Sequence, residues 1–201
     1  MKYIFVVGAP GSKWSSVAKN IYFSPDIDRS DYTEARTYKH HAGVMHIGAY
    51  FDPGMEFEIP ANIEDMPKEA IEQLFDSPFT GTGTRIIKSH VLSNHIDFLR
   101  TTWPDCPVVL VYRGDDACLG WWVKCGHFDI KYPCYDYYVD LATMASHIEE
   151  QNYNILTAQN MHDTITPASN RELCDFLQIE RPPEQYYQYY FQEDISVAVI
   201  R

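Results

Sequence analysis

Residues 3–7 read Tyr-Ile-Phe-Val-Val, an unbroken apolar run, and a turn rich in glycine, proline and serine follows directly at residues 8–12. A run without polar alternation is typical of a strand that is buried on both faces of a parallel sheet. Apolar residues then recur at helical spacing over residues 14–22, and Ser24-Pro25 ends the pattern. The opening unit is therefore predicted to be a strand, a tight loop and a helix. This order of elements is typical of an α/β fold.

Later segments continue this pattern of alternating elements. Apolar runs predict two more buried strands, at residues 85–88 and 107–112. Helical spacing predicts helices over the ranges 67–75, 91–99, 115–124 and 137–151. A capping box that begins at Ser169 predicts one more helix, up to residue 177. Weak alternation over residues 195–200 is compatible with a late strand or with a tail.

These elements predict one α/β domain over residues 1–201, with a central parallel sheet flanked by helices and joined by right-handed crossovers. The three apolar runs are expected to be interior strands. Residues 26–84 are punctuated by proline and glycine, and residues 125–137 show little periodicity. We expect both stretches to be irregular insertions that bind an acceptor molecule.

The charge and the cysteines exclude several classes of protein. The 28 acidic residues outnumber the 16 lysines and arginines, which gives a formal net charge of −12. This balance disfavours nucleic acid as a partner but leaves room for a local basic pocket. The five cysteines form no C-x-x-C pair, and no apolar stretch approaches the length of a membrane span. We therefore expect a cytoplasmic protein with no membrane partner.

The loop after the first strand has the composition of an anion-binding loop. Backbone N–H groups at a helix N-terminus attract phosphate, and serine hydroxyls and a lysine add donors and charge. The candidate residues are Gly11, Ser12, Lys13, Trp14, Ser15 and Ser16. A Walker A motif is excluded by register, because Trp14 stands where the lysine is required. The alternative is a plain turn between a strand and a helix.

Two further candidates follow the other apolar runs. Lys88-Ser89-His90 comes at the end of the run 85–88, and Arg113 comes directly after the run 107–112. Ligands of open α/β sheets bind at the carboxyl ends of the strands, where a guanidinium can clamp a phosphate. The alternatives are a surface pair for Lys88 and His90 and a salt bridge from Arg113 to Asp115 or Asp116.

Together, and in this order, the three elements resemble the nucleotide-dependent sulfotransferase family. Its phosphate loop is commonly written Pro-Lys-Ser-Gly-Thr-Thr-Trp, and residues 10–16 here read Pro-Gly-Ser-Lys-Trp-Ser-Ser. Its Lys-Thr-His is similar to Lys88-Ser89-His90, and its strand ending in arginine is similar to residues 111–113. The late helix that follows Ser169 also resembles the family. The resemblance covers about 40% of the chain, namely the ranges 3–24, 85–124 and 167–180.

The resemblance implies a P-loop-like fold and transfer of a sulfuryl group from 3′-phosphoadenosine 5′-phosphosulfate to the hydroxyl of a carbohydrate or small molecule. It implies that His90 is the general base, that Lys88 lies beside the transferred group, that the loop binds the 5′-phosphosulfate and that Arg113 binds the 3′-phosphate. No metal is expected. The chain departs from the family pattern in two places: the loop lysine comes two positions later, and Trp121 stands where the family has a serine.

Other interpretations stay open at this point. A small-molecule or nucleotide kinase would use the same loop with ATP and Mg²⁺, and a non-catalytic nucleotide-binding module would keep the fold alone. Three histidines, His40, His41 and His46, suggest a metal site, but they lack the spacing of accompanying ligands.

Two other groups of residues are weaker candidates. Asp52 and Glu56 either belong to a turn or bind acceptor hydroxyls. Trp121 and Trp122 either stack on a planar group or belong to the core.

Overall fold

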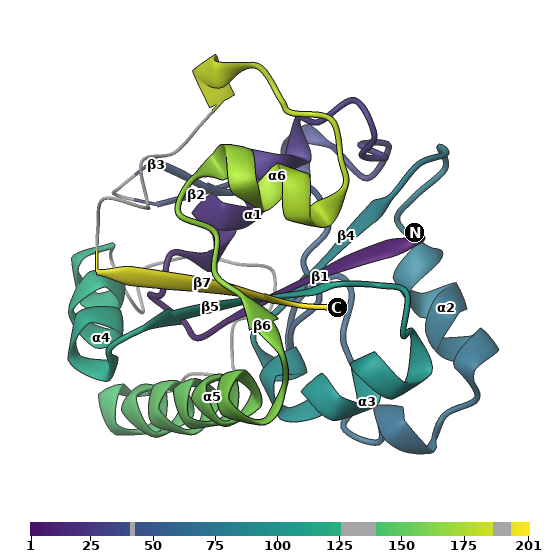
Figure 1. Ribbon diagram of the computed structural model, residues 1–201. Helices are drawn as coiled ribbons and strands as arrows, with labels where there is room; N and C mark the ends of the chain where they lie inside the picture. Colours follow the sequence, from purple (N-terminus) through teal and green to yellow (C-terminus); the bar gives the residue numbers. More distant parts are fainter. Residues whose placement is uncertain (41–42, 126–139, 187–193) are drawn as a thin grey trace.

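The computed structural model describes residues 1–40, 43–125, 140–186 and 194–201, with a five-stranded mixed sheet at its centre (Figure 1). The strands lie in the order β4-β1-β5-β7-β6. Their bounds are β1 (Tyr3–Gly8), β4 (Arg85–Ser89), β5 (Val108–Arg113), β6 (Thr164–Ile165) and β7 (Ile195–Ile200). β1 pairs in parallel with β4 on one side and with β5 on the other. The expected α/β fold and the strand predictions at residues 3–7, 85–88 and 107–112 are confirmed.

Helices cover both faces of the sheet. One face packs against α1 (Trp14–Tyr22) and α6 (Asn170–Leu177), and the other packs against α2 (Lys68–Asp76), α3 (Ile96–Thr102) and α5 (Leu141–Met161). The side chains of β1 alternate between the two cores, with Phe5 and Val7 on the α3 side and Ile4 and Val6 on the α1 side. Since both faces are buried, every residue of β1 is apolar or glycine.

Residues 26–84, expected to be irregular, contain ordered elements besides the predicted helix, which is confirmed as α2. A separate antiparallel ribbon pairs β2 (Tyr38–His40) with β3 (Gly43–His46). Two 3₁₀ turns, η1 (Glu34–Arg36) and η2 (Ile63–Asp65), complete the stretch. Short strands and 3₁₀ turns carry little periodicity, so they could not be predicted from the sequence pattern.

The prediction that residues 85–88 form an interior strand is wrong, because β4 is the first strand in the order of the sheet. Its outer edge is covered by irregular chain. The Asp28 N–H donates to the Thr84 carbonyl at 2.9 Å, and the Phe51 N–H donates to the Lys88 carbonyl at 3.0 Å. This cover keeps Ile86 and Ile87 buried, which explains why the segment resembles an interior strand.

The sheet is also not wholly parallel. Residues 195–200 form β7, which runs antiparallel to β5 and pairs with β6 on its other side. β7 lies inside the sheet, with Val199 and Ile200 buried on opposite faces. The last strand in the sequence therefore lies between β5 and β6, and β6 is the outermost strand on that side of the sheet.

Several helix boundaries differ from the predictions. The stretch 91–99 begins as a 3₁₀ helix, η3 (Val91–His95), before α3 begins. The helix predicted over 137–151 is α5, which continues to Met161, and residues 137–139 lie outside the described residues. The predicted insertion 125–137 likewise lies outside them except for Cys125, which ends α4 (Asp115–Lys124).

The late helix is confirmed as α6, with Ser169 accepting a hydrogen bond from the Glu172 N–H. A last 3₁₀ turn is η5 (Glu184–Tyr186).

Candidate functional site

The carboxyl ends of the three parallel strands meet at one edge of the sheet. The chain leaves β1 toward β4 on one side, and it leaves β5 toward β6 and β7 on the other. A crevice at such a reversal of strand order is where open α/β sheets bind ligands. The loop after β1 lies at this point and contacts both neighbours.

Two residues of the loop, Gly11 and Lys13, have a left-handed backbone conformation. Gly11 has φ +79°, and a side chain there would collide with the Cys118 carbonyl of α4, so the position requires glycine. Lys13 has φ +63° and caps α1, whose first turn follows. The Ser12 N–H donates to the Ala9 carbonyl at 3.0 Å, while its hydroxyl is fully buried without a hydrogen-bond partner in the described part of the chain. A buried hydroxyl without a partner indicates a place for a ligand atom or a water.

Trp14 and Ser15 are buried, and Ser16 is partly exposed. The Ser16 N–H is already engaged, because it donates to the Lys13 carbonyl at 2.8 Å. Trp14 belongs to the core beneath α1 rather than to the surface of the loop. Of the predicted loop residues, Gly11, Ser12 and Lys13 are therefore the ones that remain candidates for binding a ligand at the switch point of the sheet.

His90 follows β4 and packs directly against the loop. Its Nδ1 lies 2.6 Å from the Gly8 carbonyl oxygen, and its ring meets the Trp14 ring edge-on at 4.8 Å. Because a carbonyl oxygen only accepts, Nδ1 carries the proton and Nε2 of the neutral ring is the basic nitrogen. Burial lowers the pKa of His90, although the charge of Asp52 opposes this. The ring is therefore neutral and basic at Nε2 near pH 7, but its residue is only 4% exposed.

Lys88 is the second candidate on β4 and is likewise buried, at 3% exposure. Its ammonium donates to the Ile47 carbonyl, and it shares a small hollow with Ser15 and Tyr22 of α1. Burial lowers the pKa of Lys88 from 10.5 to about 8, against the opposing charge of Asp31. The alternative of a surface pair for Lys88 and His90 does not hold, since both side chains are enclosed. With Trp14 they form what we call the inner cluster.

A carboxylate anchors each end of the segment that covers the inner cluster. Asp31 accepts from the Tyr22 hydroxyl at 2.9 Å and from the Ala49 N–H at 2.7 Å. Asp52 accepts from three consecutive residues, 89–91, at the end of β4. Residues 47–52 are therefore fastened over Lys88 and His90 by hydrogen bonds from both sides.

On the other side of the loop, three cations surround one indole. The ring of Trp121 on α4 lies 4.2 Å from Lys13 Nζ, 5.4 Å from Lys124 Nζ and 5.9 Å from the Arg113 guanidinium carbon. We call these four residues the outer cluster. They concentrate positive charge at the crevice of a chain that is acidic overall.

Arg113 links the outer cluster to the loop. Its Nη1 donates to the Gly11 carbonyl at 3.2 Å, and its Nε donates to Asp194 at 3.1 Å. The salt bridge expected to Asp115 or Asp116 is therefore wrong, and Asp115 instead accepts from Asn152 at 2.6 Å. Lys124 and Asp194 were not predicted: Lys124 contacts Trp121 three positions earlier on α4, whereas Asp194 pairs with Arg113 across 81 positions.

The remaining candidates are engaged elsewhere. Glu56 forms a bidentate pair with Arg36, at 2.6 and 2.8 Å, which favours the structural interpretation of that residue. Trp122 is 4% exposed and packs in a small core with Met144 and Ile148, so it is a core residue.

His46 is buried and stacks on Tyr50 at 4.5 Å, while His41 and the side chain of His40 lie outside the described residues. In the described part of the chain, no three His, Cys, Asp or Glu side chains gather as metal ligands would.

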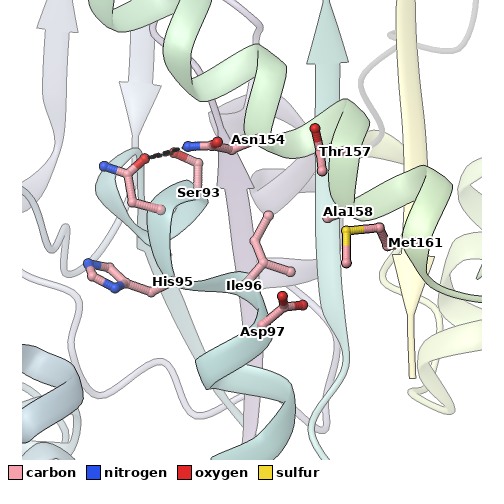
Figure 2. Close-up of a pocket in the computed structure, with 9 residues that line it drawn as sticks. Ser93, His95, Ile96, Asp97, Asn154, Thr157, Ala158 and Met161 are labelled. Carbon is pink, nitrogen blue, oxygen red and sulfur yellow. Dashed lines mark hydrogen bonds between the residues drawn. The ribbon is translucent and has the colours of Figure 1, made fainter.

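A separate polar hollow of about 150 Å³ lies between the η3–α3 segment and α5 (Figure 2). Asn154 donates to Asn94 at its rim at 2.8 Å, and the Asp97 carboxylate on α3 contacts His162 at 2.6 Å. None of the predicted site residues lines this hollow.

Fold and site define an α/β protein with a glycine-containing loop at the switch point of a mixed sheet. No model of a protein family, no curated protein and no solved structure matches the chain. Across the described residues, none of the helices has both the length and the apolar composition needed to cross a bilayer.

Proposed function

We propose that the protein transfers a sulfuryl group from 3′-phosphoadenosine 5′-phosphosulfate to an acceptor hydroxyl. The observation that carries the proposal is that His90 and Arg113 contact the same short loop from opposite sides, at the Gly8 and Gly11 carbonyls. A histidine, a buried lysine and an arginine thus lie around one loop. The similarity of these three motifs to the sulfotransferase family supports the choice of donor.

In this proposal, the loop and the outer cluster bind the donor. The Ser12 hydroxyl and the loop N–H groups bind the 5′-phosphosulfate, and Arg113 with Lys13 binds the 3′-phosphate. Cationic stabilisation suits this reaction, because charge spreads over the oxygens of the transferred group in the transition state.

His90 Nε2 accepts the proton of the acceptor hydroxyl as the oxygen attacks sulfur. The bond from sulfur to the 5′-phosphate oxygen breaks, and its electron pair leaves with 3′,5′-adenosine diphosphate. Lys88 neutralises charge on the bridging oxygen. Because His90 and Lys88 are enclosed, residues 47–51 have to move away from Lys88 before the reactants meet, while Asp52 keeps its bonds to residues 89–91.

The test is release of 3′,5′-adenosine diphosphate from the donor, measured over a panel of hydroxyl-bearing carbohydrates and small molecules without added metal. We expect His90→Gln, whose amide still offers a donor to the Gly8 carbonyl, to lower turnover about 10²-fold or more and to leave nucleotide affinity within about twofold. The matched control is His95→Gln, which changes a histidine that contacts Glu64 outside the inner cluster.

A His90→Gln variant with normal turnover would remove His90 from the chemistry. Turnover that requires ATP and Mg²⁺ would favour the kinase alternative instead.

A further inference from the structure

Asp52 holds the chain that carries His90 mainly through one carboxylate oxygen, Oδ1, while Oδ2 accepts a longer bond of 3.2 Å from the His90 N–H. Its Oδ1 accepts from the Ser89 hydroxyl and the His90 N–H, both at 2.9 Å, and from the Val91 N–H at 3.2 Å. The residue is 3% exposed, so these bonds are protected from water. Three donors converging on one buried oxygen restrict the turn after β4 to one conformation.

The other oxygen of Asp52 faces the imidazole. Oδ2 lies 3.9 Å from His90 Nε2, which is too long for a hydrogen bond but close for two charges in dry surroundings. The basic nitrogen of His90 therefore has a carboxylate oxygen close beside it.

The other groups around His90 supply no negative charge. Trp14 and Tyr50 present rings to the imidazole, at 4.8 and 5.8 Å. His46 stacks on Tyr50, and the Lys88 ammonium is turned to the Ile47 carbonyl. Among the described residues, Asp52 provides the one carboxylate oxygen within 4 Å of the imidazole.

We infer that Asp52 is a positioning residue for His90: Oδ1 fixes the main chain that carries the ring, and Oδ2 provides the counter-charge when Nε2 is protonated. The inference rests on the proposed function. The acceptor hydroxyl gives its proton to Nε2 as its oxygen forms the bond to sulfur and 3′,5′-adenosine diphosphate leaves, and the positive charge of the imidazolium then lies beside Oδ2. The charge pair exists only after the proton has moved, so it stabilises the transition state more than the ground state.

The variant Asp52→Asn separates the two roles of the carboxylate. Its amide oxygen can occupy the place of Oδ1 and keep the three bonds to residues 89–91, while the negative charge is lost. We expect the pKa of His90, followed by ¹H–¹⁵N NMR of the ring nitrogens, to fall, because the counter-charge favours the protonated form. We also expect turnover to fall about 10- to 100-fold, with the acidic limb of the pH profile shifted to lower pH.

Two control variants test whether the effect is specific to the charge of Asp52. Ser89→Ala deletes one bond to Oδ1 and keeps the charge, so the pKa of His90 should not change. Asp31→Asn removes a buried carboxylate that faces Lys88 instead, and it should likewise leave the titration of His90 in place.

A pKa of His90 that is the same in Asp52→Asn and in the unmodified protein would overturn the inference. So would a lowered pKa with unchanged turnover. A third outcome is that the pKa of His90 falls in Asp52→Asn but the unmodified protein transfers no sulfuryl group. In that case the charge coupling between Asp52 and His90 holds and the proposed function fails. The failure of the inference and the failure of the proposed function are therefore distinguishable.

Discussion

The inner and outer clusters lie on either side of the same loop and differ in almost every physical respect. Trp14, Lys88 and His90 are enclosed, and the Lys88 ammonium and the His90 ring each bond to a main-chain carbonyl. The outer cluster of Lys13, Arg113, Trp121 and Lys124 reaches the surface, and its cations gather around an indole. The two sides of one loop therefore differ: its inner side is part of the core, and its outer side carries positive charge.

The largest difference is expected in stability. Trp14 is 2% exposed and contacts the rings of His46, Tyr50 and His90, so Trp14→Ala leaves a large cavity. We expect it to lower the free energy of unfolding by about 3–5 kcal/mol in urea titrations. The matched change in the outer cluster, Trp121→Ala, should cost about 1 kcal/mol or less. Equal losses at the two tryptophans would show that the clusters do not differ in this way.

A smaller effect is expected in the pH dependence of stability. Burial lowers the pKa of Lys88 from 10.5 to about 8, so between these values the unfolded chain binds more protons than the folded one. The free energy of unfolding therefore gains up to about 3 kcal/mol from this group as the pH rises from 8 to 10.5. Below pH 8 the lysine is protonated in both states and adds no slope.

The check is a series of urea titrations between pH 7 and 10.5 on Lys88→Met and on Lys124→Met, which changes a lysine of the outer cluster. We expect the first variant to lose the rise and the second to keep it. A rise that persists in Lys88→Met would assign it to another group.

Much of the fold follows from local sequence. The apolar runs of β1 and β5 predict buried strands, and the helical spacing of α1 and the serine cap of α6 agree with the structure. An apolar run reports burial but not which strands lie beside it, so it did not show that β4 ends the sheet or that β7 pairs antiparallel to β5.

The site was predicted less completely, because its contacts join distant parts of the chain. Sequence placed Lys88, His90 and Arg113 at strand ends, as the structure has them. It did not show that Ile47 and Asp52 cover the first two, or that Asp194 pairs with Arg113 across 81 positions. Such contacts depend on how irregular segments cross the sheet edge, which no local period encodes.

The central claim is that the loop and the outer cluster bind a nucleotide with a 3′-phosphate, and calorimetric titration with 3′,5′-adenosine diphosphate tests it most directly. We expect the unmodified protein to bind this nucleotide more tightly than ATP–Mg²⁺. Arg113→Ala should weaken binding by about 1.5–3 kcal/mol, the worth of a charge-assisted hydrogen bond. Arg100→Ala, which removes an arginine bound to His162 and the terminal carbonyl instead, should bind normally. No heat of binding from either nucleotide, or equal affinity in Arg113→Ala and the unmodified protein, would contradict the account.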